Sequence, residues 1–393
     1  FASIFTGSKT IFENKMKTVL KTFLLIATFT LGNLSLFAQA GHNHAGHAHA
    51  EEIHAEETHT DTASVDETHA EVTPADEKFD AVAVIMHHIS DAHDFHILDY
   101  TDDHGIEHPV SIPLPVILFT DGDLDVFMSS EFNHGHDTVK VGNHAYFLDH
   151  GHIAEVSGSN LHPIDFSITK NVFSMLLSVF LLVFIFATVG RSYRNGVLAP
   201  KGLASFIEPL VLFVRDDIAV PNIGEKKANK FLPYLLTVFF FILMNNLLGL
   251  IPFFPGSANL TGNISFTITL SFITFLITNL NGNKDYWKHI FATPGVPLWL
   301  APIMIPVELM GIFAKPIALL IRLFANITAG HIIILSLISL IFIFKTIMIA
   351  PVSVGFVLFM DVLELLVAAL QAYIFTLLSA LFIGMAVAEH EHN

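Results

Sequence analysis

Long apolar runs dominate the second half of the chain. The runs at 172–189, 231–251 and 264–280 can each cross a bilayer, which takes ~20 apolar residues in a helix. Two later runs, at about 300–344 and 351–388, exceed one perpendicular span, so they must tilt strongly or lie partly in the membrane plane. The pattern therefore predicts five crossings.

Basic residues set the predicted orientation of these crossings. Arg191, Arg194 and Lys201 follow the first run at once, which places its end in the cytoplasm by the positive-inside rule. The segment Lys201–Val214 has a mixed face and is expected to lie along the cytoplasmic surface. Five crossings from an exported N-terminus put the acidic tail Glu389–Asn393 in the cytoplasm.

Shorter patterns before the first span predict a small β-rich exported domain over 79–165. The apolar stretch Ser111–Phe119 is followed by Asp121-Gly122, a strong hairpin signal, and then by Leu124–Met128. This combination indicates two paired strands.

A helix is possible near Val82–His96, and it would carry several imidazoles: His87, His88, His93 and His96. Their spacing does not make a single ligand face on a helix. Surface histidines are therefore favoured over a metal site there.

Composition agrees with a membrane protein that has a soluble front end. The 393 residues are 52% hydrophobic and only 14% charged. The net charge of −17 comes from acids crowded into residues 50–165, which argues against nucleic acid as a partner. Cysteine is absent, which excludes disulfides and thiolate chemistry.

The N-terminal segment has the pattern of a signal peptide over 16–40. Basic residues precede the apolar run Thr22–Leu31, and small residues end at Ala40. The alternative is an amphipathic N-terminal helix. Residues 1–15 precede Met16, the plausible initiator, and we expect them to be an upstream artefact.

A low-complexity tract over 41–78 follows, too polar to bury a core. Its histidines are His42, His44, His47, His49, His54, His59 and His69. Clustered imidazoles can bind zinc, copper or nickel, but no spacing defines a tetrahedral site. A solvated disordered tail is favoured, and no metal site is predicted.

Polar and ionisable residues interrupt the last two apolar runs. They are Glu308, Lys315, Arg322, Asn326, His331, Asp361, Glu364 and Gln371. A charge at the bilayer centre costs ~2.5–3.5 kcal/mol on insertion scales, so such residues indicate function. The structural alternative is a buried ion pair that joins two helices.

Spacing relates these residues to one another. Glu308, Lys315 and Arg322 lie seven apart, so they share a helical face. If the last two runs form an antiparallel hairpin with its turn near Lys345–Pro351, residues at equal depth have numbers averaging about 347. His331 then faces Glu364, and by the same relation Arg322 faces Gln371.

These side chains can do two kinds of chemistry. Arg322 cannot carry a proton, but its permanent charge attracts a partner's carboxylate and repels protons. An imidazole and a carboxylate, such as His331 and Glu364, can exchange protons near neutral pH.

Two segments of this hairpin resemble the signature of F-type ATP synthase subunit a. Arg322–His331 reads RLFANITAGH and Leu370–Leu378 reads LQAYIFTLL. The resemblance covers about residues 165–388, and it implies a membrane domain over 166–393. That domain would hold one spanning helix, one amphipathic surface helix, a spanning hairpin and two long tilted helices.

The resemblance also implies residue roles. Arg322 matches the family's essential arginine and Gln371 its conserved glutamine. The other implied proton-path residues are Asn246, Asn263, His331 and Glu364 on the outer side, Asn326 near the arginine, and Glu308 toward the cytoplasm.

The implied function is that of an ion-channel stator in the Fo sector of the complex. Two half-channels would load and unload protons on a c-ring carboxylate beside Arg322. The expected partners are the c-ring proteolipid, the b-subunit peripheral stalk, the rest of the ATP synthase and the lipid bilayer. No cofactor is expected, and no phosphate-binding motif G-x-x-x-x-G-K-[ST] occurs, so the chain is not an enzyme on its own. The expected location is the cell inner membrane.

A metal transporter with a His-rich sensor domain is the rival function. It accounts for the tract at 41–78, but a fixed mid-membrane arginine would repel cations from a transport site. Metal uptake by vesicles would distinguish the two functions.

Overall fold

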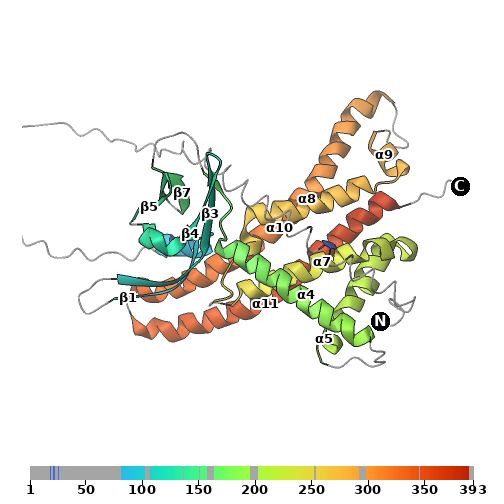
Figure 1. Ribbon diagram of the computed structural model, residues 1–393. Coiled ribbons are helices and arrows are strands. Elements are labelled where there is room, and N and C mark those ends of the chain that lie inside the picture. Colours follow the sequence, from blue (N-terminus) through green and yellow to red (C-terminus); the bar gives the residue numbers. More distant parts are fainter. Residues whose placement is uncertain are drawn as a thin grey trace, which may run out of the picture.

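The computed structural model describes residues 18, 21, 22, 25 and 81–388, except 102–106, 136, 150, 157–162, 195–201, 252–253, 292–297 and 345. The described chain has two parts, a small β-rich part and a larger helical part (Figure 1). We call residues 81–165 the β-module. The predicted fold class, a helical polytopic membrane protein with a small β-rich N-terminal module, is confirmed.

The β-module opens with helix α3, Ala81–Ile89, and a two-stranded antiparallel sheet of β1, Asp94–Thr101, and β2, Glu107–Pro113. The predicted helix near Val82–His96 is thus too long, because His93 and His96 lie beyond its end.

The reason is hydrogen bonding between Asp91, just after α3, and residues distant in the sequence. Its carboxylate accepts from the Asn171 amide at 3.1 Å and the Thr169 hydroxyl at 2.8 Å. These bonds hold Asp91 at the start of the next helix, α4, so the chain leaves α3 and enters β1.

The predicted hairpin is confirmed as strands β3, Pro115–Thr120, and β4, Asp123–Met128. Its turn residues Asp121 and Gly122 have φ angles of 53° and 100°, the left-handed conformation that a tight turn of this type requires. The short strand β8, Ile164–Asp165, pairs with the other side of β3.

A second three-stranded sheet is a meander. It consists of β5, Val139–Val141, β6, His144–Asp149, and β7, His152–Glu155, and it follows the 3₁₀ segment η3, Ser129–Gly135. Buried side chains from both sheets form the core of the β-module: Val116, Leu118, Phe127, Phe132, Val139, Tyr146 and Ile153.

The helical part begins with α4, Lys170–Arg194, a candidate span. Next comes α5, Leu203–Phe213, which buries Ala204, Ile207 and Val211 and exposes Leu203 and Phe206. A π-helical segment η4, Val214–Ala219, and the short α6, Val220–Ile223, continue it. This stretch corresponds to the predicted surface helix.

The centre of the helical part is α7, Glu225–Gly249, whose spanning window is 83% buried. A loop with the 3₁₀ turn η5, Leu260–Gly262, leads to α8, Ile264–Leu280. After α8 the chain bends by 101° into α9, Lys284–Phe291.

The last two helices form a long antiparallel hairpin (Figure 1). The 3₁₀ turn η6, Leu298–Leu300, leads into α10, Ala301–Phe344; η7, Ile347–Ile349, joins it to α11, Ala350–Val387. Of the most apolar stretch of each helix, only 11% and 17% is buried, so most of the hairpin surface is not covered by other described residues. Four described helices are long and apolar enough to cross a membrane, and the bent pair α8–α9 would make five.

Candidate functional site

Helix α10 carries half of the predicted site residues and packs through one stripe. Leu319, Leu323 and Ile327 are buried on the inner side of the helix. Arg322 and Asn326 lie beside this stripe and are exposed. Within the described residues Arg322 has no ion pair or hydrogen bond, so its permanent charge is open to a partner on the exposed face of α10.

Gln371 on α11 is buried, unlike Arg322. The two residues lie at matching positions of the hairpin, as their numbers predict. No hydrogen bond joins them in the described part of the chain. The structure therefore places them on the two helices of the hairpin, without a hydrogen bond between them among the described residues.

His331 and Glu364 are in contact across the hairpin. The Nδ1 atom of His331 lies 2.8 Å from Oε1 of Glu364, and both side chains are largely buried. The same Nδ1 atom lies 3.1 Å from the carbonyl of Ile327. A single N–H cannot point at both acceptors, and the carboxylate oxygen has no aligned hydrogen bond. The pair is thus a close charge contact with one carboxylate oxygen available to another donor.

Gly330 permits this contact. A Cβ atom at Gly330 would lie 2.8 Å from Oε1 of Glu364, which is closer than real Cβ contacts. Glycine therefore lets the Glu364 carboxylate lie directly against the backbone of α10. A glycine before a histidine in an apolar helix was the signal in the sequence, and its role in packing was not predicted.

The loop between α7 and α8 borders the same pair. The His331 ring also faces the carbonyl of Gly249, the last residue of α7. The Thr328 hydroxyl, one turn before His331, lies 3.5 Å from the carbonyl of Gly262 in η5. Neither carbonyl could be anticipated from residue types, because any residue provides one.

The two predicted outer asparagines have different surroundings. Asn246 is buried near the end of α7 and donates to the carbonyl of Ala368 on α11 at 3.1 Å; its Oδ1 atom has no partner among the described residues. Asn263 caps α8, because its side chain accepts from the amide of Ser265 at 2.9 Å. Asn246 thus adds a polar group beside α11, whereas Asn263 has a structural role in α8.

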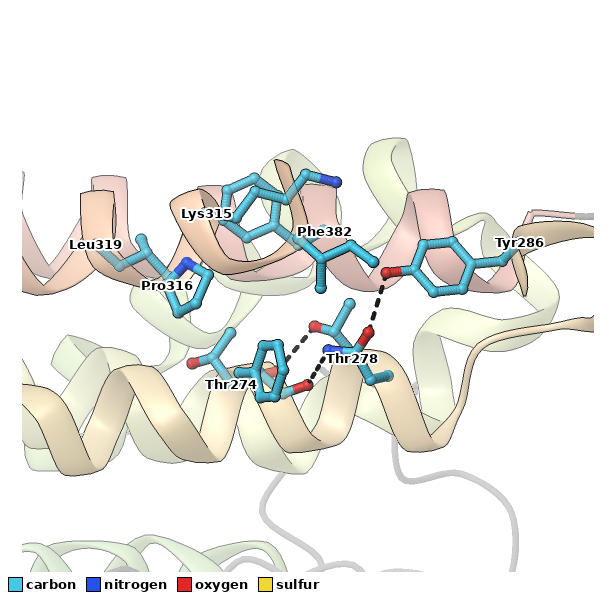
Figure 2. Close-up of a pocket in the computed structure, with 10 residues that line it drawn as sticks. Thr274, Thr278, Tyr286, Lys315, Pro316, Leu319 and Phe382 are labelled. Carbon is cyan, nitrogen blue, oxygen red and sulfur yellow. Dashed lines mark hydrogen bonds between the residues drawn. The ribbon is translucent and has the colours of Figure 1, made fainter. Parts of the chain in front are cut away.

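Glu308 and Lys315 lie toward the other end of α10 and are both half-buried. The Lys315 ammonium lies 5.6 Å from the centre of the Phe382 ring of α11. Lys315 also lines a small, partly open pocket between the bent pair α8–α9 and the hairpin, together with Thr274, Thr278 and Tyr286 (Figure 2). This end of the hairpin thus combines charge with hydroxyl groups.

The β-module has its own buried polar contacts. His93 lies 3.0 Å from Asp165, which corrects the expectation of a surface histidine. Burial alone would raise the pKa of Asp165, but its hydrogen bonds with His93 and Ser167 lower that pKa below its usual value. The His144 ring lies 3.1 Å from Glu155, and this bond raises the pKa of His144.

Tyr146 belongs to the same part of the core. Its hydroxyl donates to Asp125 at 2.6 Å, and burial raises the pKa of Tyr146 to about 12.

Among the described residues no group of three or more acidic or imidazole side chains is arranged to hold a metal ion. The His-rich tract at 41–78 and the predicted signal at 16–40, four isolated residues aside, lie outside the described residues.

Comparisons with known proteins match both parts of the chain. The family described as ATP synthase A chain matches residues 172–384, and Domain of unknown function (DUF8433) matches residues 84–171. ATP synthase subunit a of Chloroherpeton thalassium is 47% identical over 260 residues, 64% of this chain and 76% of that protein. ATP synthase subunit a of Myxococcus xanthus is 44% identical over 270 residues, 67% of this chain and 86% of that protein. ATP synthase subunit a 2 of Chlorobaculum tepidum is 52% identical over 237 residues, 58% of this chain and 66% of that protein.

Proposed function

Because this chain belongs to the ATP synthase A chain family, we propose that its residues 166–393 form two proton half-channels that meet a rotating ring of c subunits at Arg322. The subunit is the proton-translocating stator component of the Fo sector and is not itself catalytic. The observation that supports the channel most directly is the buried contact between His331 and Glu364.

Protons enter through the outer half-channel by way of this pair. The Glu364 carboxylate accepts the incoming proton, and the imidazole of His331 stabilises the carboxylate until then. The Oδ1 atom of Asn246, buried and without a partner among the described residues, is a further acceptor along the path, with Asn263 at the mouth. Asn326 lies between Arg322 and His331 along α10, and Gln371 lies on the facing helix α11 at about the depth of Arg322.

Arg322 separates the two half-channels. Its exposed side chain attracts the deprotonated c-subunit carboxylate, by ~4 kcal/mol at 4 Å with an effective dielectric of 20, before desolvation. The incoming proton neutralises that carboxylate, which is released from Arg322 and moves into lipid. The permanent charge also repels a free proton that would otherwise leak through.

Protons leave through the inner half-channel near Glu308. After nearly a full rotation the protonated c subunit returns to the inner side of Arg322 and loses its proton toward the cytoplasm. The membrane potential contributes ~2.3 kcal/mol per charge per 100 mV to this cycle.

The partners and the location of the subunit belong to the same proposal. The bare surface of α10 and α11 meets the c-ring, and the b-subunit stalk and remaining subunits complete the assembly. The protein resides in the cell inner membrane with its N-terminus exported after removal of a signal at 16–40, and its C-terminus in the cytoplasm. The segment 79–165 is then an exported domain beside the outer half-channel.

Purification from detergent-solubilised membranes tests this function. The tagged chain should co-purify with a small two-helix proteolipid, and vesicles containing the complex should acidify when ATP is added. A chain that is recovered intact, without a proteolipid and without ATP-driven acidification, would contradict the proposal. Metal uptake by the same vesicles would instead favour a transporter.

A further inference from the structure

We infer that the β-module is a brace for the outer half-channel, and that its residue Phe95 positions His331 through the loop between α7 and α8. This inference rests on the proposed role of His331 and Glu364 in proton uptake. It gives a function to the part of the chain that lies outside the channel itself.

The brace begins at an aromatic cluster where three segments meet. Phe95 of β1 is 2% exposed, and its ring lies 5.3 Å from that of Phe254 in the α7–α8 loop, edge to face. Phe173 of α4 lies 5.5 Å from both rings. Such ring pairs add about 0.5–1.5 kcal/mol beyond burial and favour one relative orientation. The loop is therefore held against the β-module and the spanning helix together.

Polar contacts fix the β-module to α4 beside this cluster. Lys170, the first residue of α4, donates its ammonium group to the carbonyl of His88 at 3.0 Å and its amide to the carbonyl of Ala92 at 2.9 Å. Asp91 accepts from the amide of Asn171 and the hydroxyl of Thr169. Helix α3 also packs against α10. The β-module is thus a fixed support for the loop.

The other end of the loop contacts the surroundings of His331. A Cβ atom at Gly249 would lie 3.2 Å from the carbonyl of Ala258, so the loop passes close to the end of α7. The His331 ring faces the carbonyl of that same Gly249. Farther along, Asn259 holds η5 by accepting from the amide of Gly262, whose carbonyl faces Thr328 of α10.

A physical path therefore runs from Phe95 to Phe254, along the loop, to both carbonyls beside His331 and Thr328. Shortening the Phe95 side chain removes the contact that holds the loop against the β-module. The distance between the His331 imidazole and the Glu364 carboxylate is then no longer fixed. Phe95 acts as a positioning residue, because it contacts the loop and not the pair. Its removal should change how proton uptake depends on pH, which a loss of β-module stability alone would not do.

The test compares Phe95→Leu with a matched control in the complete ATP synthase. Phe132 is 1% exposed and contacts Phe127 at 5.3 Å, edge to face, within the core of the β-module and away from the loop. Phe132→Leu therefore removes a similar contact without touching the brace. ATP-driven proton pumping is measured against pH in inverted membrane vesicles, with rates normalised to the amount of assembled complex.

We expect Phe95→Leu and Phe254→Leu to lower the maximal rate by roughly three- to tenfold, less than the ~10²-fold that a 1 Å misplacement can cause. Both should displace the pH profile in the direction that Glu364→Gln displaces it, and the double variant should add little to either. Phe132→Leu should keep the profile of the unmodified protein. If Phe95→Leu assembles poorly, Phe254→Leu tests the same contact from the loop side.

The inference is overturned if Phe95→Leu and Phe254→Leu have the pH profile of Phe132→Leu while His331→Ala still changes pumping. If His331→Ala pumps like the unmodified protein at every pH, the proposed function fails instead. The two failures are thus distinguishable in a single set of membranes.

Discussion

The Nδ1 atom of His331 and Oε1 of Glu364 are 2.8 Å apart, although the residues lie on different helices of the hairpin. One imidazole and one carboxylate therefore share a buried space. Their identities matter as a pair, because two carboxylates or two imidazoles in that space would repel when charged.

Exchanging the two residues tests this pairing. His331→Glu alone and Glu364→His alone should each slow proton pumping, because each creates two like groups. The double exchange restores one acid and one imidazole and should recover much of the lost rate. Pumping is measured against pH for all four proteins in the same membranes. Additive losses in the double variant would show that the residues do not act as one unit.

Arg322→Ala should abolish ion-driven ATP synthesis while the complex still assembles. Nothing else on the exposed side of α10 at that depth supplies a permanent positive charge within the described residues. Arg322→Lys should rescue only in part, since lysine can lose its proton and lacks the planar fork. ATP synthesis is assayed in reconstituted vesicles under an imposed proton gradient. Normal synthesis by the alanine variant would remove Arg322 from the mechanism.

Gly330→Ala should slow proton pumping, although the substitution adds only one methyl group. The added Cβ would lie 2.8 Å from Oε1 of Glu364, so the carboxylate or the helix must move. We expect a loss of about tenfold in pumping rate, because small displacements at such sites have large effects. Gly355→Ala on α11 is the control, since its Cβ would meet nothing within 4 Å. Equal rates for the two variants would argue against a tight fit at Glu364.

Deletion of Gly41–Thr73 should leave proton pumping intact at neutral pH in excess chelator. The composition of this segment predicts a solvated tail, and it precedes both matched families. Pumping by vesicles with and without the segment gives the comparison. Loss of pumping under these conditions would place the tract in the ion path.

The β-module should be less stable at pH 8 than at pH 6 because of His144. The bond with Glu155 raises the pKa of His144 in the folded state, so its contribution is complete below the unfolded pKa of about 6.5 and is lost as the pH rises through the raised value. Hydrogen-exchange protection of β6 and β7 in the whole protein, corrected for intrinsic rates, measures this. Glu155→Gln should flatten the difference, and an unchanged slope would contradict it.

The contact between His331 and Glu364 could be predicted from residue numbers because helices are regular. Each residue advances 1.5 Å, so in an antiparallel hairpin equal depth means a constant sum of residue numbers. The relation holds approximately for Ser353, whose hydroxyl donates to the carbonyl of Leu337, and for Lys315 over Phe382, with a small drift of register along the hairpin. The regular rise of the two helices therefore relates residues of α10 to residues of α11 along the hairpin.

The predictions from sequence were wrong where residues distant in the chain decide the local structure. The end of α3 depends on bonds from Asp91 to Thr169 and Asn171, almost eighty positions later, which no local pattern reveals. His93 is part-buried for the same reason, because its partner Asp165 belongs to β8. The sequence showed where polar groups occur in the membrane half, but not which backbone carbonyls surround them.

The far end of α11 has a mechanical consequence. A Cβ at Gly384 would collide with the carbonyl of Asn222, and the Val387 carbonyl accepts from Lys227 and Asn283, both at 2.7 Å. This end of α11 is therefore held by α6, by α7 and by the residue before α9, while α7 and α8 also pack along the hairpin. A sideways force on the exposed face of the hairpin would be passed to these neighbours, and most rigidly at the last turn, where a Cβ at position 384 has no room.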